Sequence, residues 1–138
     1  MTRLAAPQSW TALEPSNLVL PDGTLEIVLP LRTKSAANAR GHWSVHARTA
    51  KLERRAVALM LRFAKGPRPE FPAVVSFVRV APSPLDDDNL RGAMKALRDE
   101  IAAWLGVNDR DARIVWQYAQ ERGPVRTYGV RVRIGAAS

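Results

Sequence analysis

The order of apolar patterns along the chain constrains its fold more than any other feature. Some segments form short apolar or alternating runs, as strands do, and two longer segments repeat apolar residues every three to four positions, as helices do. The expected strands are residues 24–31, 73–80, 112–119 and 126–134, and the expected helices are residues 44–64 and 88–105. This order predicts an α+β fold, in which two main helices pack on a small mixed sheet of about four to five strands.

The first 23 residues do not continue this pattern. They mix proline, serine and small residues without a clear period, so we expect a loosely ordered N-terminal extension (residues 1–23) with a short extended piece at residues 18–20. Residues 24–138 are then expected to form the folded domain, because a chain of 138 residues fits one domain with one core.

Composition excludes several classes of protein. The chain has no cysteine, which excludes disulfides and thiolate metal sites and is compatible with the reducing cytoplasm. No apolar run approaches the roughly 20 residues of a membrane helix, and the N-terminus lacks the apolar stretch of a signal peptide. Because there is also no glycine-rich phosphate loop, we expect a cytoplasmic protein without a membrane segment or a nucleotide cofactor.

Charge is distributed unevenly along the chain. The net charge is +8, and residues 32–68 carry ten basic side chains and a single acid, Glu53. A basic surface favours polyanions, because neutralising phosphates releases condensed counterions. Residues 86–111, in contrast, hold seven of the 13 acidic residues. A DNA-binding protein gains nothing from such an acidic cluster unless a cation binds there.

The first expected helix has an apolar face with a basic stripe beside it. At 3.6 residues per turn, the face that we expect to contact the core comprises Val45, Leu52, Ala56, Leu59, Met60 and Phe63. The stripe comprises Arg48, Lys51, Arg55 and Arg62. Such a stripe is usually only solvated surface, but with the net charge it indicates contact with phosphates.

Three consecutive carboxylates, Asp86, Asp87 and Asp88, open the second expected helix. In an extended approach to the helix, Asp86 and Asp88 would point to the same side and Asp87 to the other. Two carboxylates on one side suit Mg²⁺ or Mn²⁺. The alternative is helix capping, since Asp is a preferred N-cap residue and negative charge is favourable at a helix N-terminus.

The second helix is expected to bury one side and to expose the side that carries Asp88. The expected core positions are Leu90, Ala93, Met94, Leu97, Ile101 and Trp104. The expected neighbours of Asp88 are Arg91, Gly92, Lys95 and Asp99. Asp109 and Asp111 follow this helix, and they either form a turn or return beside Asp86 to supply a third carboxylate. Phosphodiester hydrolysis uses cations held by shared carboxylates in this way.

Two of these segments together resemble the signature of the RusA family of Holliday junction resolvases. LDDDNL at residues 85–90 resembles the family's Asp-x-Asp-Asn segment that opens a helix, and NDRDARIVW at residues 108–116 resembles its acidic turn entering a strand. The loop that contains Asn38 and Arg40, followed by Trp43, also resembles the family's N-terminal Asn-containing loop. The resemblance covers roughly residues 24–134.

The resemblance implies a RusA-like homodimer that binds four-way DNA junctions and makes paired symmetric nicks with Mg²⁺, for which Mn²⁺ could substitute. By position, Asp86 and Asp88 match the two motif aspartates. Asp111 matches the third, with Asp109 as the competing assignment. We expect Asn38, Arg40, Arg48, Lys51 and Arg55 to bind the DNA backbone.

The chain departs from the family pattern at one position. Family members usually have a lysine four residues after the second motif aspartate, where this chain has Gly92. Lys95 lies nearly two helical turns after Asp88, and helical side chains lean toward the N-terminus. We therefore expect Lys95 to replace the missing lysine in catalysis, with Arg91 as the other candidate.

Two further classes of function remain open from the sequence. One is a non-catalytic basic DNA-binding protein, in which the aspartates only cap a helix and form a turn. The other is a metal-dependent hydrolase of nucleotides or small phosphates, which the excess of positive charge disfavours.

Overall fold

The protein has an α+β fold with a mixed sheet. The computed structural model describes residues 9–33, 43–64 and 68–137. Within these ranges there are six strands and three helices. In chain order they are β1 (Thr11–Ala12), β2 (Ser16–Val19), β3 (Leu25–Leu29), α1 (Trp43–Arg62), β4 (Ala73–Ala81), α2 (Asp87–Ala93), α3 (Lys95–Leu105), β5 (Ile114–Arg122) and β6 (Thr127–Ala136). The expected fold class is confirmed, with more strands and helices than the sequence predicts.

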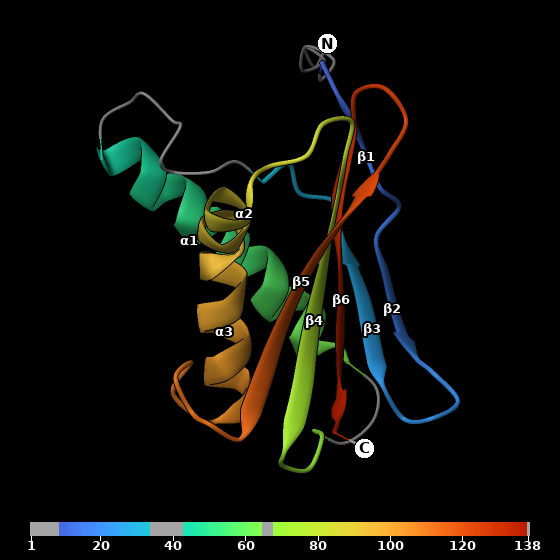
Figure 1. Ribbon diagram of the computed structural model, residues 1–138, viewed down its shortest axis with the longest axis vertical. Coiled ribbons are helices and arrows are strands. Elements are labelled where there is room, and N and C mark those ends of the chain that lie inside the picture. Colours follow the sequence, from blue (N-terminus) through green and yellow to red (C-terminus); the bar gives the residue numbers. More distant parts are fainter. Residues whose placement is uncertain (1–8, 34–42, 65–67, 138) are drawn as a thin grey trace, which may run out of the picture.

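The strands are ordered β2-β3-β6-β4-β5, and β1 pairs in parallel with the start of β6. β4 and β5 are also parallel neighbours, joined through α2 and α3, whereas the pairs β2–β3, β3–β6 and β6–β4 are antiparallel. All three helices lie on the same side of the sheet (Figure 1). β5 forms one edge of this sheet, and among the described strands only β4 pairs with it.

The core lies between this face of the sheet and the helices. Alternate residues of β3, β4 and β6 are buried there, as their alternating patterns require. The helix residues of the core comprise Val57, Leu61, Leu90, Ala93, Met94, Leu97, Ile101 and Leu105. The core side predicted for residues 88–105 is therefore confirmed, with Trp104 partly buried against it. None of the helices in the described ranges is long and apolar enough to cross a bilayer.

The N-terminal segment is more ordered than expected, although the short extended piece expected at residues 18–20 overlaps β2. β1 and β2 both belong to the sheet, where β2 pairs with β3 over four residue pairs. The alternation in this segment is too short to stand out in the sequence, and the strands exist because neighbouring strands supply their hydrogen bonds. Residues 1–8 lie outside the described residues.

The helix expected at residues 88–105 is two helices. Met94 ends α2 and begins α3, with φ −92° and ψ −2°. Its N–H is shared between the carbonyl oxygens of Leu90 and Arg91, each at 3.2 Å. Gly92 lies two residues before this break, and glycine weakens a helix at such a point. Helical phase counted across residue 94 is therefore not continuous.

The apolar face predicted for α1 is not the face that contacts the core. Val57 and Leu61 are buried, whereas Leu52, Leu59 and Phe63 are 59%, 56% and 67% exposed. α1 thus has two apolar sides, and a periodicity argument cannot tell which one the fold covers. Ala56 is half-buried and Met60 packs against the core, while the side chain of Val45 lies outside the described ones.

Candidate functional site

The acidic segment lies where the chain leaves the carboxyl end of β4 and enters α2. Asp86 is the N-cap residue of α2, and its Oδ1 accepts the backbone N–H of Asn89 at 2.9 Å. Asp87 and Asp88 occupy the first helical turn, and all three carboxylates are exposed. Negative charge is favourable there because the N–H groups of a first turn have no helical partners.

The expected alternation of these carboxylates is wrong. Asp86 is extended, with φ −70° and ψ 168°, but Asp87 and Asp88 are already helical. Helical residues turn by about 100° each rather than alternating. Asp86 and Asp88 are therefore neighbours at one helix end, and not two residues on the same side of an extended strand.

A glutamine from β5 holds the chain just before the acidic segment. The side chain of Gln120 accepts the N–H of Leu85 at 2.8 Å and donates to the carbonyl oxygen of Leu85 at 2.7 Å. The buried Arg79 of β4 donates to the carbonyl oxygen of Ser83 at 3.0 Å and to Gln120 Oε1 at 3.4 Å. Sequence reasoning missed both residues, because polar residues in strands usually face solvent and nothing local marks these two as internal.

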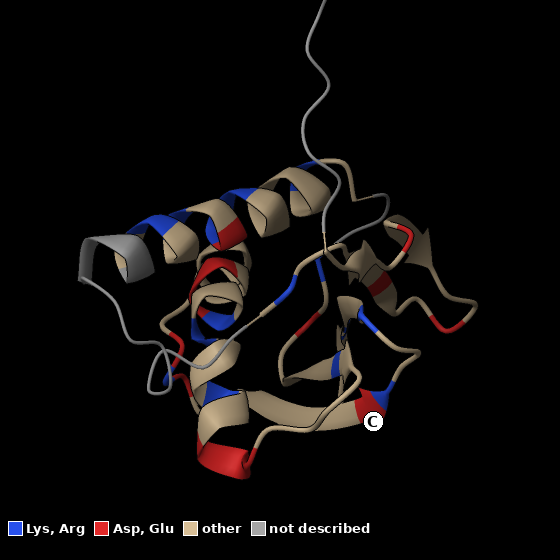
Figure 2. Cartoon of the chain, turned by 90° about the horizontal axis from the view of Figure 1, so that it is seen from above, with Lys and Arg blue, Asp and Glu red and all other residues tan. Residues whose placement is uncertain are grey.

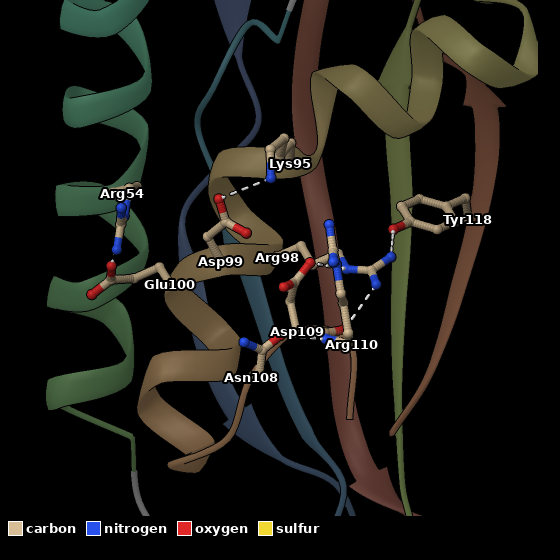
Figure 3. A network of polar contacts seen from close by, with 9 residues as sticks. All are labelled: Arg54, Lys95, Arg98, Asp99, Glu100, Asn108, Asp109, Arg110 and Tyr118. Atoms are coloured by element: carbon tan, nitrogen blue, oxygen red, sulfur yellow. Dashed lines mark hydrogen bonds and ion pairs between the residues drawn. The ribbon is translucent and has the colours of Figure 1, made fainter. Parts of the chain in front are cut away.

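The second acidic pair is engaged in ion pairs with arginines. Asp111 binds the guanidinium of Arg113 through two bonds of 3.1 and 2.8 Å, and these bonds lower the pKa of its carboxyl to about 2. Asp109 Oδ2 lies 3.3 Å from Arg98 Nε. Arg98 also donates to the Tyr118 hydroxyl at 2.9 Å and to the Asp109 carbonyl at 2.8 Å (Figure 3).

These two acidic groups do not meet within one chain. β4 and β5 run parallel with Ala73 beside Ile114 and Ala81 beside Arg122. Asp86 therefore follows the carboxyl end of this strand pair, and Asp111 precedes its amino end. Each strand has nine residues, so the two ends are roughly 26 Å apart at about 3.3 Å per residue.

The expected single-chain site of three carboxylates is therefore wrong. Within the described residues, no three Asp, Glu, His or Cys side chains are grouped to hold a metal ion. Asp109 lies along α3, beside Arg98 and Trp116, and does not reach the start of α2. The predicted return of this turn to Asp86 fails because the parallel connection brings the chain back to the opposite end of the sheet.

The two candidate cations near Asp88 contact other groups. Lys95 Nζ lies 3.4 Å from Asp99 Oδ2, so it extends toward the C-terminus of α3 rather than toward Asp88 (Figure 3). Arg91 lies over the ring of Tyr118, with its Cζ 5.6 Å from the ring centroid. A Cβ atom added at Gly92 would have no neighbour within 4 Å, so close packing does not explain this glycine.

The basic stripe predicted for α1 is exposed. Figure 2 shows Lys and Arg positions, in blue, repeated along the coloured part of this helix. Arg48, Lys51 and Arg55 are all exposed. Within the described residues, α1 forms an ion pair through Arg54, whose Nε lies 3.0 Å from Glu100 Oε2 of α3. The expected DNA-binding residues Asn38 and Arg40 lie outside the described residues.

Glu53 differs from every other charged residue of α1. It lies one helical turn before the buried Val57, and its Oε2 is buried without a hydrogen-bond partner in the part of the chain that is described. Burial raises the pKa of this carboxyl to about 7. Charge counting along the sequence would treat Glu53 as a surface acid, since only packing reveals its burial.

Comparison of the chain with protein-family models finds no match, and comparison with curated proteins finds no relative.

Proposed function

We propose that the protein is a RusA-like, Mg²⁺-dependent endodeoxyribonuclease of the cytoplasm, which resolves Holliday junctions by paired symmetric nicks in DNA recombination and repair. The observation that supports this proposal best is an exposed run of three carboxylates, fixed to the sheet at Leu85, in a chain of net charge +8. A run of carboxylates repels the phosphates that a strongly basic protein attracts, unless a bound cation bridges the carboxylates to a phosphate.

The donor set at Asp86 and Asp88 fits Mg²⁺. This ion usually keeps several waters and binds through one or two carboxylates together with substrate phosphates, rather than in a complete protein cage. Both carboxylates are exposed, and neither has an ion-pair partner within the described residues. When bound, the ion would activate water and neutralise charge on the phosphate.

Binding of the DNA backbone is assigned to α1 and the loop before it, through Asn38, Arg40, Arg48, Lys51 and Arg55. The exposed cations of α1 support this assignment, because neutralising phosphates releases counterions.

Arg91 and Lys95 remain the candidates for stabilising charge on the reacting phosphate. Arg91 is the nearer to Asp88 along the helix, and Lys95 would have to leave its exposed ion pair with Asp99.

A second copy of the chain is part of the proposal because Asp111 and Asp86 lie at opposite ends of the sheet. Residues 114–120 of the edge strand β5 carry no charged side chain, and such an edge readily pairs with another strand. Antiparallel pairing of two β5 strands about a two-fold axis would set the amino end of one beside the carboxyl end of the other. Asp111 of the second copy would then lie at the same end as Asp86.

A pairing centred on Gln117 is self-complementary. It would place Trp116 opposite Tyr118 of the second copy, and Glu121 opposite Arg113, and aromatic and oppositely charged cross-strand pairs are stabilising. Because the chain has no cysteine, Gln117→Cys tests this directly. Two such residues would lie about 4.5–5.5 Å apart between Cα atoms, so mild oxidation should give a covalent dimer. The exposed control variant Val125→Cys should stay monomeric under the same conditions, and a monomeric Gln117→Cys would remove this pairing.

The activity itself is tested with a synthetic four-way junction, with and without Mg²⁺. We expect Asp86→Asn and Asp88→Asn each to lower the cleavage rate by about 100-fold or more while junction binding persists or tightens, because loss of charge weakens the metal site and the repulsion of phosphate. Glu70→Gln removes an exposed carboxylate before β4 and should cut normally. Wild-type cleavage by either aspartate variant would refute the site assignment.

One observation favours a second candidate function, a non-catalytic DNA-binding protein. Asp86 caps α2, and Asp109 and Asp111 form ion pairs with arginines, so these three aspartates have structural roles without any metal. Isothermal titration with Mg²⁺ separates the two candidates. If the protein only binds DNA, the wild type and Asp86→Asn should give the same titration with Mg²⁺. If it is the proposed nuclease, the wild type should bind Mg²⁺ and Asp86→Asn should lose that binding.

A further inference from the structure

Side chains of β4 and β5 hydrogen-bond the segment that joins β4 to the acidic run, residues 82–85. Its anchor is the carboxamide of Gln120, which makes both an accepting and a donating hydrogen bond to the backbone of Leu85, at 2.8 and 2.7 Å. The carboxamide thus makes the same pair of hydrogen bonds with Leu85 that the backbone of a neighbouring strand residue would make. The residue directly after this anchored position is Asp86.

Arg79 reinforces the same segment from β4. Arg79 is 7% exposed, and its Nη1 donates to the carbonyl oxygen of Ser83 at 3.0 Å and to Gln120 Oε1 at 3.4 Å. The guanidinium thus contacts the anchoring carboxamide and the anchored segment together. Breaking one of these bonds leaves partly buried polar groups without partners, which is costly in such surroundings.

We propose that Gln120 is a positioning residue, which fixes Leu85 and thereby holds the Asp86 carboxylate in place to bind a divalent cation. The inference rests on the proposed function and extends it to a residue that touches neither metal nor DNA. Gln120 acts through Leu85, as groups beyond the direct ligands of a metal orient those ligands. Arg79 holds the carboxamide in the orientation that this contact needs.

Only a carboxamide meets both requirements of Leu85 at this reach. Its N–H needs an acceptor and its carbonyl oxygen needs a donor, and glutamine offers one of each. A glutamate at position 120 could accept from the N–H and pair with Arg79, but it would leave the carbonyl oxygen without a donor. Methionine of similar length would make neither bond.

The test compares Gln120→Met with Asn17→Leu in the 138-residue chain. Asn17 of β2 also donates a carboxamide hydrogen bond to a backbone carbonyl oxygen, that of Met60 at 2.7 Å, and it contacts neither β5 nor the acidic segment in doing so. We expect Gln120→Met to weaken Mn²⁺ binding about 10-fold or more by isothermal titration. Hydrogen exchange at the Leu85 amide should accelerate in this variant. Asn17→Leu should leave Mn²⁺ affinity and Leu85 exchange unchanged, and the far-ultraviolet circular dichroism of both variants should match that of the wild type.

Gln120→Glu provides a second variant, because a carboxylate at this position would still accept the Leu85 N–H and would pair with Arg79. It adds negative charge near Asp86, which by attraction alone would strengthen Mn²⁺ binding. We nevertheless expect weaker binding, since the bond to the Leu85 carbonyl oxygen is lost. Stronger binding by Gln120→Glu, or wild-type affinity in Gln120→Met, would overturn the positioning role and leave the proposed function standing. If the wild type binds no Mn²⁺ that depends on Asp86, the proposed function fails and the positioning role fails with it.

Discussion

Replacing Glu53 with glutamine should remove a loss of stability that the protein undergoes between about pH 5 and pH 8. The carboxyl of Glu53 lies on the core side of α1, with its Oε2 buried and unpaired within the described residues, and burial raises its pKa from 4.5 to about 7. Ionising this group in the folded protein costs free energy because the charge loses its hydration. The carboxamide of the Glu53→Gln variant stays neutral at every pH, and the substitution preserves the length of the side chain.

The sign and size of the effect follow from linkage between protonation and folding. Below pH 4.5 the carboxyl is neutral in both the folded and the unfolded chain, so it costs nothing. Between pH 4.5 and 7 the unfolded chain releases the proton first, and the free energy of unfolding falls until the folded form ionises as well. From about pH 5 to pH 8 this loss amounts to about 2 to 3 kcal/mol for Glu53 alone.

The assay is urea denaturation followed by circular dichroism at pH 5, 6, 7 and 8. From pH 5 to pH 8, the free energy of unfolding of Glu53→Gln should increase relative to that of the wild type by about 2 to 3 kcal/mol. Glu70→Gln removes the same charge from an exposed site and controls for net charge. A difference that stays constant from pH 5 to pH 8 would refute the burial of an unpaired carboxylate.

Two other predictions concern the backbone and the basic stripe. Gly92→Ala should raise the free energy of unfolding by up to about 1 kcal/mol, because a Cβ atom at this helical position meets no neighbour. Gly106→Ala should lower it by about 1 kcal/mol, because Gly106 has φ +80°. Equal shifts of the two variants in thermal melts would contradict this reasoning. Binding of a four-way junction should weaken with salt at a log–log slope of roughly −3 or steeper, at about −0.9 per phosphate contact. Charge reversal at Arg48, Lys51 and Arg55 should flatten that slope, and an unchanged slope would exclude α1 from the DNA surface.

The sequence by itself determined the features that depend on local periodicity. The order of the main strands and helices follows from runs of period two and period 3.6, as does the buried side of α2 and α3 with Met94, Leu97 and Ile101. The position of the acidic run at a helix start follows as well, because Asp86 is a preferred capping residue. These properties depend on residues within a few positions of one another.

Only the tertiary structure decided which distant residues meet. The parallel register of β4 and β5 separates Asp86 from Asp111, although both flank the same pair of helices in the sequence. α1 carries two apolar sides, and packing against α3 and the sheet selected the side with Glu53 rather than the side with Leu59. Gln120 reaches Leu85 across 35 positions of sequence. Contacts of this kind leave no periodic trace in the chain, because they depend on how strands and helices pair in space.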